Sequence, residues 1–471
     1  MSEERFANYD DYHFIEVINR FRDMQKMNRV GFFDVYEFEN IIDYYIEQRD
    51  FKNAKDAAKI GINQHPNSSL LKLKFAQILV ENGKPSEGLS ILRSVESLEI
   101  NNYELFLAKG VAYNLLGKVN DAKKEFEKAI SISNDWRDEV IYSIALSYIQ
   151  INKINQAINY LLLGHEVNPE NSLIVFELAM CYERIDKVEE SIRYYLKYLD
   201  IDPFAENVWF SLGMLYGSLN DVKKALEAYD YALAINPDYT SAYYNKAGVL
   251  VNDENYTEAI KVYEELLKYE ENDPQILCYI GECYEKLGNL PDALRSFKKS
   301  LRIDNNFGDG LFGISLVYFD KKRYNIGEQY IYDALKVDPE NSEYWFMLGE
   351  IKNAQNKLCE ALDAYNRTIE LDPNDYEAWL AKANILYNQK KLADAIDILS
   401  QAYRFNYDIS SVNYRLAAYY FYNHDNIRAT EYFEKGLSLN FNEYKEIFQN
   451  FPRTSESGIF KQLILKYRIK N

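Results

Sequence analysis

The residue types that most often carry catalysis or bind metals are dispersed along this 471-residue sequence. Its four histidines lie in four separate regions: His13, His65, His165 and His424. Cys278 and Cys283 are five positions apart, whereas the paired cysteines of a zinc ribbon are separated by only two residues. The sequence contains no phosphate-binding loop, dinucleotide-binding glycine motif or hydrolase nucleophile motif. We therefore expect no catalytic, cofactor or metal site, and we expect the protein not to be an enzyme.

The charge of the sequence narrows the range of partners. Its 54 Lys and Arg residues stand against 73 Asp and Glu residues, which gives a formal net charge of −19 at pH 7. Nucleic acids and anionic membrane surfaces are bound mainly through Lys and Arg, so both are disfavoured as ligands. A protein or peptide with exposed basic groups is the expected partner.

The first residues and the cysteines indicate a compartment. Residues 1–11 are polar and acidic and lack the basic and apolar regions of a secretory signal. No apolar run is long enough to span a membrane, and the four cysteines form no disulfide framework. These features predict a cytoplasmic protein with free thiols.

Small residues recur at a fixed period through most of the chain. Twelve anchor positions hold only Ala, Gly or Ser, and every interval between them is 34 residues except the 35 residues from Ala122 to Ala157. The anchors are Ala54, Gly88, Ala122, Ala157, Ser191, Ala225, Ala259, Ala293, Gly327, Ala361, Ala395 and Ala429. Twelve residues before each anchor lies a second position, which is small in eleven of the twelve cases. Such a period indicates a stack of repeats.

Each period contains two amphipathic helical patterns. In residues 206–239, Trp209, Gly213 and Tyr216 follow helical spacing, and a second apolar stripe begins at the anchor Ala225. The small residues allow two helix backbones to approach closely, while the aromatic rings fill the space beside them. All ten prolines fall between repeats, at the turn inside a repeat or beyond the array, so we expect none inside a helix.

The spacing Trp-x-x-Leu-Gly-x-x-Tyr, followed by Ala, an aromatic residue, Ala and Pro, resembles the tetratricopeptide repeat (TPR) family. The resemblance implies an all-α, right-handed superhelical solenoid of antiparallel helix pairs with helical caps, in which the first helices line a concave groove. We assign residues 1–34 to an N-terminal capping helix, 35–443 to twelve repeats and 444–471 to C-terminal capping helices. The repeats are 35–68, 69–102, 103–137, 138–171, 172–205, 206–239, 240–273, 274–307, 308–341, 342–375, 376–409 and 410–443.

The end units of a repeat stack need caps, because they would otherwise expose apolar faces. We expect a helix over residues 11–27, and a capping box formed by Asp34 and Glu37 at the start of the first repeat. Residues 444–451 and 458–469 are predicted to form closing helices, the second of which is basic and has no acidic residue.

The resemblance directs certain positions into the groove. One of them, just after the leading aromatic, holds a series of rings: Tyr142, Phe176, Phe210, Tyr244, Phe312 and Phe346. These rings could hold apolar side chains of an extended or helical partner segment. The alternative is that they only pack between adjacent repeats, as is ordinary for the family.

The groove positions also carry more acidic than basic residues. Five of the acids lie in the first turn of a predicted helix, where the helix dipole alone favours them: Glu104, Glu139, Asp309, Glu343 and Glu377. The remaining excess is interpreted as a candidate acidic lining, with an ordinary solvated face as the alternative. Its residues are Glu177, Glu183, Glu282, Glu285, Asp320 and Glu350.

The best-known ligand site of the family binds the C-terminal carboxylate of heat-shock chaperones through basic groups, one of them just after the leading aromatic. None of the twelve residues at that position is basic here, which argues against such a ligand. The leading hypothesis is a scaffold or adaptor whose groove binds a protein segment with basic and apolar groups. Two alternatives stay open: self-assembly through the repeat ends or the basic C-terminal helix, and a regulatory subunit of an enzyme complex.

Overall fold

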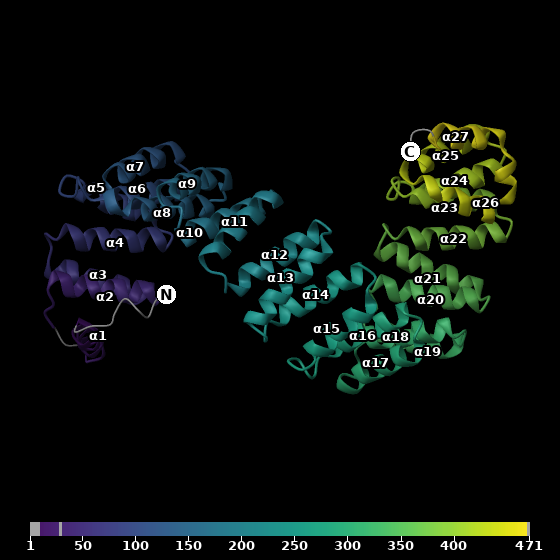
Figure 1. Ribbon diagram of the computed structural model, residues 1–471, viewed down its shortest axis with the longest axis horizontal. Helices are drawn as coiled ribbons and strands as arrows, with labels where there is room; N and C mark the ends of the chain where they lie inside the picture. The colour runs from purple at the N-terminus through teal and green to yellow at the C-terminus, as the bar shows by residue number, and fades with distance from the viewer. Residues whose placement is uncertain (1–9, 28–30, 469–471) are drawn as a thin grey trace. The chain divides into compact units, whose positions relative to one another are not determined.

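The computed structural model describes residues 10–27 and 31–468. These residues form 27 α-helices and three short 3-10 helices, and contain no strand, so the fold is all-α as predicted. The chain divides into two compact units, of which unit 1 ends at Leu219 and unit 2 begins at Asn220 (Figure 1).

Unit 1 holds the first twelve α-helices and one 3-10 helix. Their bounds are α1 (Asp10–Lys26), α2 (Val35–Glu47), α3 (Phe51–Gln64), α4 (Ser69–Glu81), α5 (Pro85–Val95), α6 (Tyr103–Leu115), α7 (Val119–Ile132), η1 (Asn134–Trp136), α8 (Arg137–Gln150), α9 (Ile154–Val167), α10 (Ser172–Arg184), α11 (Val188–Ile201) and α12 (Glu206–Ser218).

Unit 2 holds the remaining helices. Their bounds are α13 (Val222–Ile235), α14 (Thr240–Asn252), α15 (Tyr256–Leu266), α16 (Pro274–Lys286), α17 (Leu290–Ile303), α18 (Gly308–Asp320), α19 (Tyr324–Val337), α20 (Ser342–Ala354), α21 (Leu358–Leu371), α22 (Tyr376–Asn388), α23 (Leu392–Ala402), α24 (Ser410–Tyr422), α25 (Asn426–Leu439), η2 (Phe441–Glu443), α26 (Tyr444–Asn450), η3 (Pro452–Glu456) and α27 (Gly458–Arg468).

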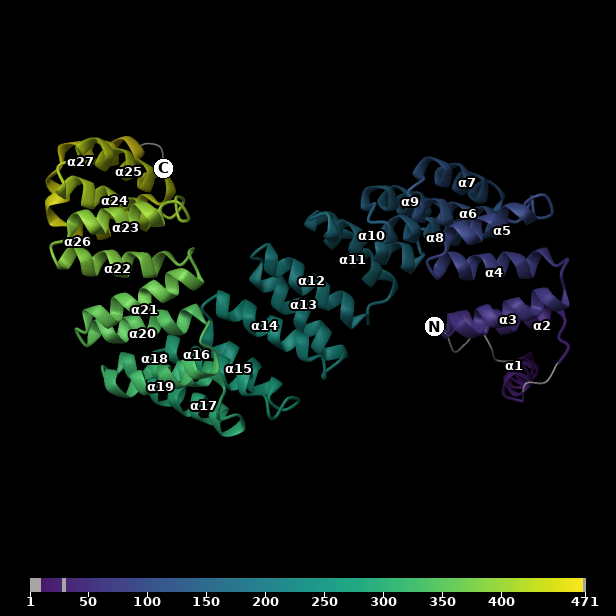
Figure 2. The same cartoon turned by 180° about the vertical axis from the view of Figure 1, so that it is seen from behind.

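Within each unit the helices pack as stacked pairs. α2 packs on α3, α4 on α5 and α6 on α7 in unit 1, and α16 on α17, α18 on α19 and α20 on α21 in unit 2 (Figure 2). The second helix of a pair contacts the first helix of the next pair. The first helices also contact one another, as α4 does with α6 and α16 does with α18. Each unit therefore has a surface built from first helices, which we call its first-helix surface.

The turn inside each pair repeats one backbone conformation. Each of twelve turns contains one residue with positive φ, near +55° to +73°, at intervals of 34 residues with a single interval of 35. These residues are Arg49, Gly83, Gly117, Asn152, Asp186, Asn220, Glu254, Gly288, Lys322, Asn356, Lys390 and His424. A left-handed residue ends a helix by turning the chain out of the helical path. The period of the small anchor residues thus reappears in the backbone itself.

The extra residue of the single 35-residue interval lies at the junction between α7 and α8. The 3-10 helix η1 lies at this junction, and α8 has 14 residues, whereas α6 and α10 have 13 each. The extra residue is therefore absorbed at the start of a first helix and leaves the packing of the pair intact.

The small residues lie where the two helices of a pair touch. The hydroxyl of Ser191 on α11 donates a hydrogen bond of 2.9 Å to the carbonyl of Ala179 on α10. A Cβ atom added at Gly110 would lie 2.2 Å from Cε1 of Phe126, and Phe126 itself is fully buried. Close backbone contact and ring packing thus depend on the same small positions, as the sequence predicts.

The prolines differ slightly from the expectation that none lies inside a helix. Pro85 and Pro274 are the first residues of α5 and α16, Pro291 is the second residue of α17, and Pro452 begins η3. The first turn of a helix has no backbone acceptor for its N–H groups, so proline costs nothing there and its fixed φ is helical.

The first unit begins with a cap. Val17, Ile18 and Phe21 of α1 are buried in one cluster with residues of α2 and α3. Asp34 and Glu37 form the predicted capping box, in which each side chain bonds the backbone N–H of the other. Residues 1–9 and 28–30 of the predicted cap lie outside the described residues.

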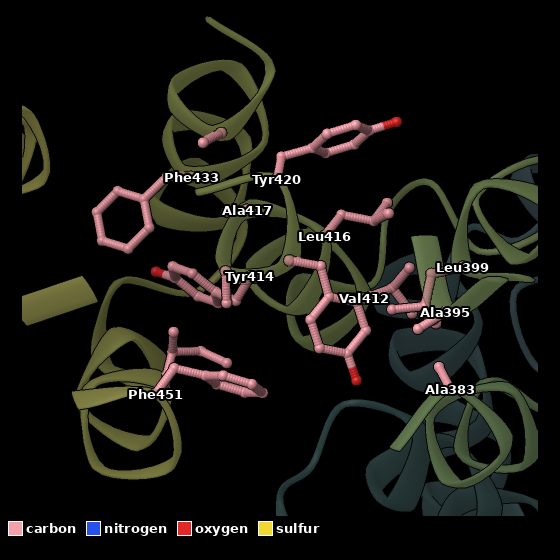
Figure 3. Packing of buried hydrophobic residues seen from close by; sticks show 14 of the residues in the cluster. Ala383, Ala395, Leu399, Val412, Tyr414, Leu416, Ala417, Tyr420, Phe433 and Phe451 are labelled. Atoms are coloured by element: carbon pink, nitrogen blue, oxygen red, sulfur yellow. The ribbon is translucent and has the colours of Figure 1, made fainter. Parts of the chain in front are cut away.

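At the far end of unit 2, α26 and α27 cover the last helix pair. Tyr414 of α24, Phe433 of α25 and Phe451 belong to one buried cluster (Figure 3). Phe460 of α27 stacks on Phe433 with ring centroids 4.0 Å apart. The C-terminal helices therefore bury the apolar face that the last pair would otherwise expose. Residues 469–471 of the predicted cap lie outside the described residues.

Candidate functional site

All twelve candidate residues lie on first helices, at the following places. Unit 1 holds Tyr142 on α8, Phe176, Glu177 and Glu183 on α10, and Phe210 on α12. Unit 2 holds Tyr244 on α14, Glu282 and Glu285 on α16, Phe312 and Asp320 on α18, and Phe346 and Glu350 on α20.

The candidate rings of unit 1 are half-buried. Phe176 packs edge-on against Tyr195 and Tyr198 of α11, with ring centroids 6.0 and 5.5 Å apart. Burial raises the pKa of Tyr142, with a further contribution from the nearby charge of Glu177. These rings contribute to packing between helices and keep part of their surface in contact with solvent.

The candidate rings of unit 2 also pack against neighbouring helices and remain partly exposed to solvent. Phe312 stacks on Tyr344 of the next first helix, with centroids 5.4 Å apart, and Phe346 lies 5.9 Å from Tyr365. The hydroxyl of Tyr244 donates a 2.8 Å hydrogen bond to Asp273, in the loop before α16. All three candidate rings are half-buried, so each could offer only one edge or face to a ligand.

The acidic candidates of unit 1 surround a tyrosine of the second helix. Burial raises the pKa of Glu177, against the opposing effect of Arg184. Glu183 accepts a 2.9 Å hydrogen bond from the hydroxyl of Tyr195, which spans the two helices of the pair. Glu183 therefore has a structural partner within the chain, whereas Glu177 is set in a partly desolvated environment of the same surface.

The acidic candidates of unit 2 include the most perturbed carboxyl group of the surface. Glu282 is exposed to solvent, although neighbouring protein partly desolvates its carboxyl group. This desolvation, with charge repulsion from Asp309 and Glu343, raises the pKa of Glu282 to about 7. The three carboxylates come from α16, α18 and α20, and the helices contact one another in that order.

Asp309 and Glu343 are not among the candidates predicted from the sequence, because the helix dipole alone explains acidic residues in a first turn. Their negative charges also raise the pKa of Glu282 on α16. Asp309 is held by a 2.9 Å hydrogen bond from the hydroxyl of Tyr344. We call Glu282, Asp309 and Glu343 the acidic triad. The signal that could have found it is their place on successive first helices, with Glu282 in the second half of α16 and Asp309 and Glu343 at the second position of α18 and α20.

The remaining acidic candidates differ in their partners. Glu350 accepts a hydrogen bond from the hydroxyl of Tyr365, so part of its hydrogen-bonding capacity is used within the protein. Glu285 lies 3.5 Å from the ammonium of Lys286. Burial raises the pKa of Asp320, against the effect of the same Lys286. At Glu282, too, Lys286 opposes the rise in pKa, but the repulsion from Asp309 and Glu343 is the larger effect.

The histidines and cysteines form no shared centre in the described ranges. Within residues 10–27 and 31–468, no group of three or more His, Cys, Asp or Glu residues could hold a metal ion. Cys181, Cys278 and Cys283 are buried free thiols, and Cys359 is an exposed one. Burial raises the pKa of Cys181 to about 11, which keeps this thiol protonated and unreactive at neutral pH. None of the helices in these ranges is long and apolar enough to cross a membrane.

Sequence models of one family match most of the array. Those described as tetratricopeptide repeat match residues 103–135, 142–206, 206–239, 249–306, 312–375 and 354–408, which together exceed half of the chain.

Curated proteins and solved structures show further similarity. The chain is 32% identical to Hsp70-Hsp90 organizing protein 3 of Arabidopsis thaliana over 99 residues, which are 21% of this chain and 18% of that protein. It is 32% identical to Hsp70-Hsp90 organizing protein 1 of Glycine max over 98 residues, 21% of this chain and 17% of that protein. The matched part thus spans less than a fifth of these relatives. Among solved structures, yeast Tom70 has a TM-score of 0.49 at 14% identity, covering 98% of both chains. A tetratricopeptide repeat protein of Parabacteroides merdae has a TM-score of 0.42 at 17% identity, covering 52% of this chain and 97% of that one.

Proposed function

Because the chain belongs to the tetratricopeptide repeat family, we propose that it is a non-catalytic scaffold or adaptor that binds a segment of another protein on its first-helix surfaces. The segment carries basic groups that pair with the acidic triad of unit 2 and apolar side chains that contact neighbouring rings such as Phe312. The described cysteines are free thiols, which persist in a reducing compartment. We therefore propose that the scaffold acts in the cytoplasm.

The observation that carries this proposal is the placement of the carboxyl groups of Glu282, Asp309 and Glu343 on the successive first helices α16, α18 and α20, and the raised pKa of Glu282 agrees with it. A carboxyl group whose pKa reaches about 7 is one that its surroundings destabilise in the charged form. A bound ammonium or guanidinium would offset the repulsion from Asp309 and Glu343 and restore the charged form. Perturbed titratable groups are candidates for binding, and here the perturbation favours a cationic ligand.

The names of the curated relatives raise the question of a chaperone ligand. Those proteins are named for organizing Hsp70 and Hsp90, and the similarity covers about a fifth of this chain. A carboxylate clamp needs basic groups on the first-helix surface, whereas Glu39, Tyr142 and Phe312 stand at the position of its first base. We therefore propose a basic segment, and not a free C-terminal carboxylate, as the ligand.

A second candidate function is self-assembly, which the surface of α27 favours. Ile459 and Leu465 are exposed at 45% and 59%, and Lys461 and Arg468 are exposed on the same helix. This combination of basic and apolar groups has the chemistry expected of the ligand, so a second copy of the chain could supply it.

Affinity capture with a matched pair of variants tests the proposal. The triad variant Glu282→Gln, Asp309→Asn, Glu343→Gln removes three carboxyl groups from first helices. The control Glu265→Gln, Asp333→Asn, Glu370→Gln removes three from exposed positions of α15, α19 and α21. Partners bound by the wild type and the control but lost by the triad variant support the proposal. Identical partners for all three proteins would contradict it. A heat-shock C-terminal peptide should not compete.

A further inference from the structure

The first-helix surface of unit 1 contains a cleft lined by residues other than the candidates predicted from the sequence. It has a volume of about 430 Å³ and lies across α4, α6 and α8. Its walls are mainly aliphatic, with Val80 from α4, Leu107 and Val111 from α6, and Leu146 from α8. The volume is at the small end of the range of ligand pockets, roughly 300–1,000 Å³, and suits one or two side chains.

The cleft exists because small residues occupy matching positions on adjacent helices. Ala108 on α6 and Ser143 on α8 are the sixth residues of consecutive repeats, where α10 carries the larger Glu177 and α16 carries Tyr279. Leu146 is 37% exposed, whereas Val80 is only 2% exposed. An apolar wall with an exposed leucine at its edge is surface that a ligand side chain would remove from water.

Polar groups border this apolar surface at two points. Glu81 lines the cleft at the end of α4, and desolvation raises its pKa, with Lys74 as the opposing cation. Lys74 already forms a 2.9 Å ion pair with Asp43. Ser147 on α8 accepts a 2.9 Å hydrogen bond from the buried side chain of Asn114. In the part of the chain that the structure describes, the side-chain oxygen of Asn114 has no hydrogen-bond partner.

We propose that this cleft binds an aliphatic side chain of a partner protein segment whose neighbouring residue is Lys or Arg. The aliphatic group fills the space between Val80, Val111 and Leu146, and the cation pairs with Glu81. The proposal rests on the scaffold function and deepens it, because it names the anchor that unit 1 would recognise. Charge complementarity decides the kind of neighbour: Glu81 lies at the border of the cleft, and its opposing cation Lys74 is already paired with Asp43, so a basic residue fits and an acidic one does not.

A titration of the full-length protein with methyl-labelled Leu and Val tests the proposal by NMR. The probe is the peptide Gly-Ser-Lys-Leu-Lys-Ser-Gly, acetylated and amidated so that it carries no terminal charge. We expect shifts of the methyl groups of Val80, Leu107, Val111 and Leu146. Replacing Leu by Gly in the peptide should weaken binding about tenfold or more, because an aliphatic side chain loses its burial. Replacing both Lys residues by Glu should abolish it.

Protein variants separate the cleft from the rest of the surface. Leu146→Lys places a cation at the cleft edge and should weaken binding about tenfold. Leu173→Lys changes a leucine that is 57% exposed on α10, outside the cleft, and should leave binding unchanged. Glu81→Gln should weaken binding about two- to fivefold, as expected for a solvent-accessible ion pair.

The contrary outcomes are equally distinct. Absence of shifts at the four cleft residues, or equal binding of the Lys and Glu peptides, would overturn the cleft proposal. Shifts confined to methyl groups of α16, α18 and α20 would also overturn it, while leaving the scaffold function and the triad in place. Failure of the scaffold function itself is read from the capture experiment, which does not involve the cleft.

Discussion

Tyr365 of α21 packs directly over Gly349 of α20: a Cβ atom added at the glycine would lie 2.5 Å from Cε1 of the ring. The ring is fully buried, so it has no free space into which it could move. The same arrangement holds between Gly281 of α16 and Phe297 of α17, where the corresponding distance is 2.7 Å. A glycine or alanine on the first helix and a ring on the second thus form one interlocking contact that recurs through the array.

Gly349→Ala should therefore destabilise the protein, although alanine is the better helix former. The expected net cost is about 1–3 kcal/mol, as for other overpacked cores. Gly248 in α14 is the matched control, because a Cβ there meets nothing within 4 Å. Gly248→Ala should stabilise by up to about 1 kcal/mol. Urea unfolding followed by circular dichroism measures both, and equal changes in the two variants would show that Tyr365 does not press on Gly349.

Lys352 tests a second kind of contact between helices. Its side chain is 3% exposed and pairs with Glu328 of α19 at 2.8 Å and with Glu360 of α21. Lys352→Ala should cost about 3 kcal/mol, the lower end for a broken buried pair, because Glu360 remains half exposed. Lys352→Met, which keeps the packing volume, should cost less than Lys352→Ala. If both variants unfold at the same temperature and urea concentration as the wild type, Lys352 does not stabilise the contact between these helices.

The pH dependence of stability tests the environment of Glu282. Its pKa is about 7 in the folded protein, against an ordinary value of 4.5 in the unfolded chain. Between these values the folded state binds more protons than the unfolded state, so its stability falls as pH rises from about 4.5 to about 7. The loss levels off about one pH unit above the folded-state pKa. Burial raises the pKa of other carboxyl groups as well, so the quantity to measure is the difference in unfolding free energy between the wild type and Glu282→Gln. Solvent screening makes this difference smaller than the full pKa shift implies. Parallel stability curves for wild type and variant across this window would contradict the raised pKa.

The period of small residues was sufficient to predict the helix pairs, because close backbone contact tolerates only Ala, Gly or Ser. It also located the one irregular repeat, since the interval from Ala122 to Ala157 coincides with the 3-10 helix η1. The family pattern placed the candidate side chains on first helices for the same reason: helical spacing fixes which face a position occupies.

The partners of those side chains could not be predicted in the same way. Helical spacing says that Glu183 and Glu350 lie on the first-helix surface, but not that tyrosines of the second helices donate hydrogen bonds to them. Lysine is usually a surface residue, yet Lys109 is buried and pairs with Glu96 and Glu125. The acidic triad forms only when neighbouring repeats stack and bring their first helices together. The sequence of a single repeat does not contain this information.

The most direct test of the scaffold account is a salt series with the segment captured by the wild type. Its dissociation constant is measured by fluorescence anisotropy against wild type, the triad variant and the control variant carrying Glu265→Gln, Asp333→Asn and Glu370→Gln. Charge attraction between accessible groups is screened within about 8–10 Å at physiological salt, so wild-type and control affinities should fall as salt rises. The triad variant should bind more weakly at low salt and depend less on salt. Equal affinities and equal salt dependence for all three proteins would contradict the account and move the binding site away from α16, α18 and α20.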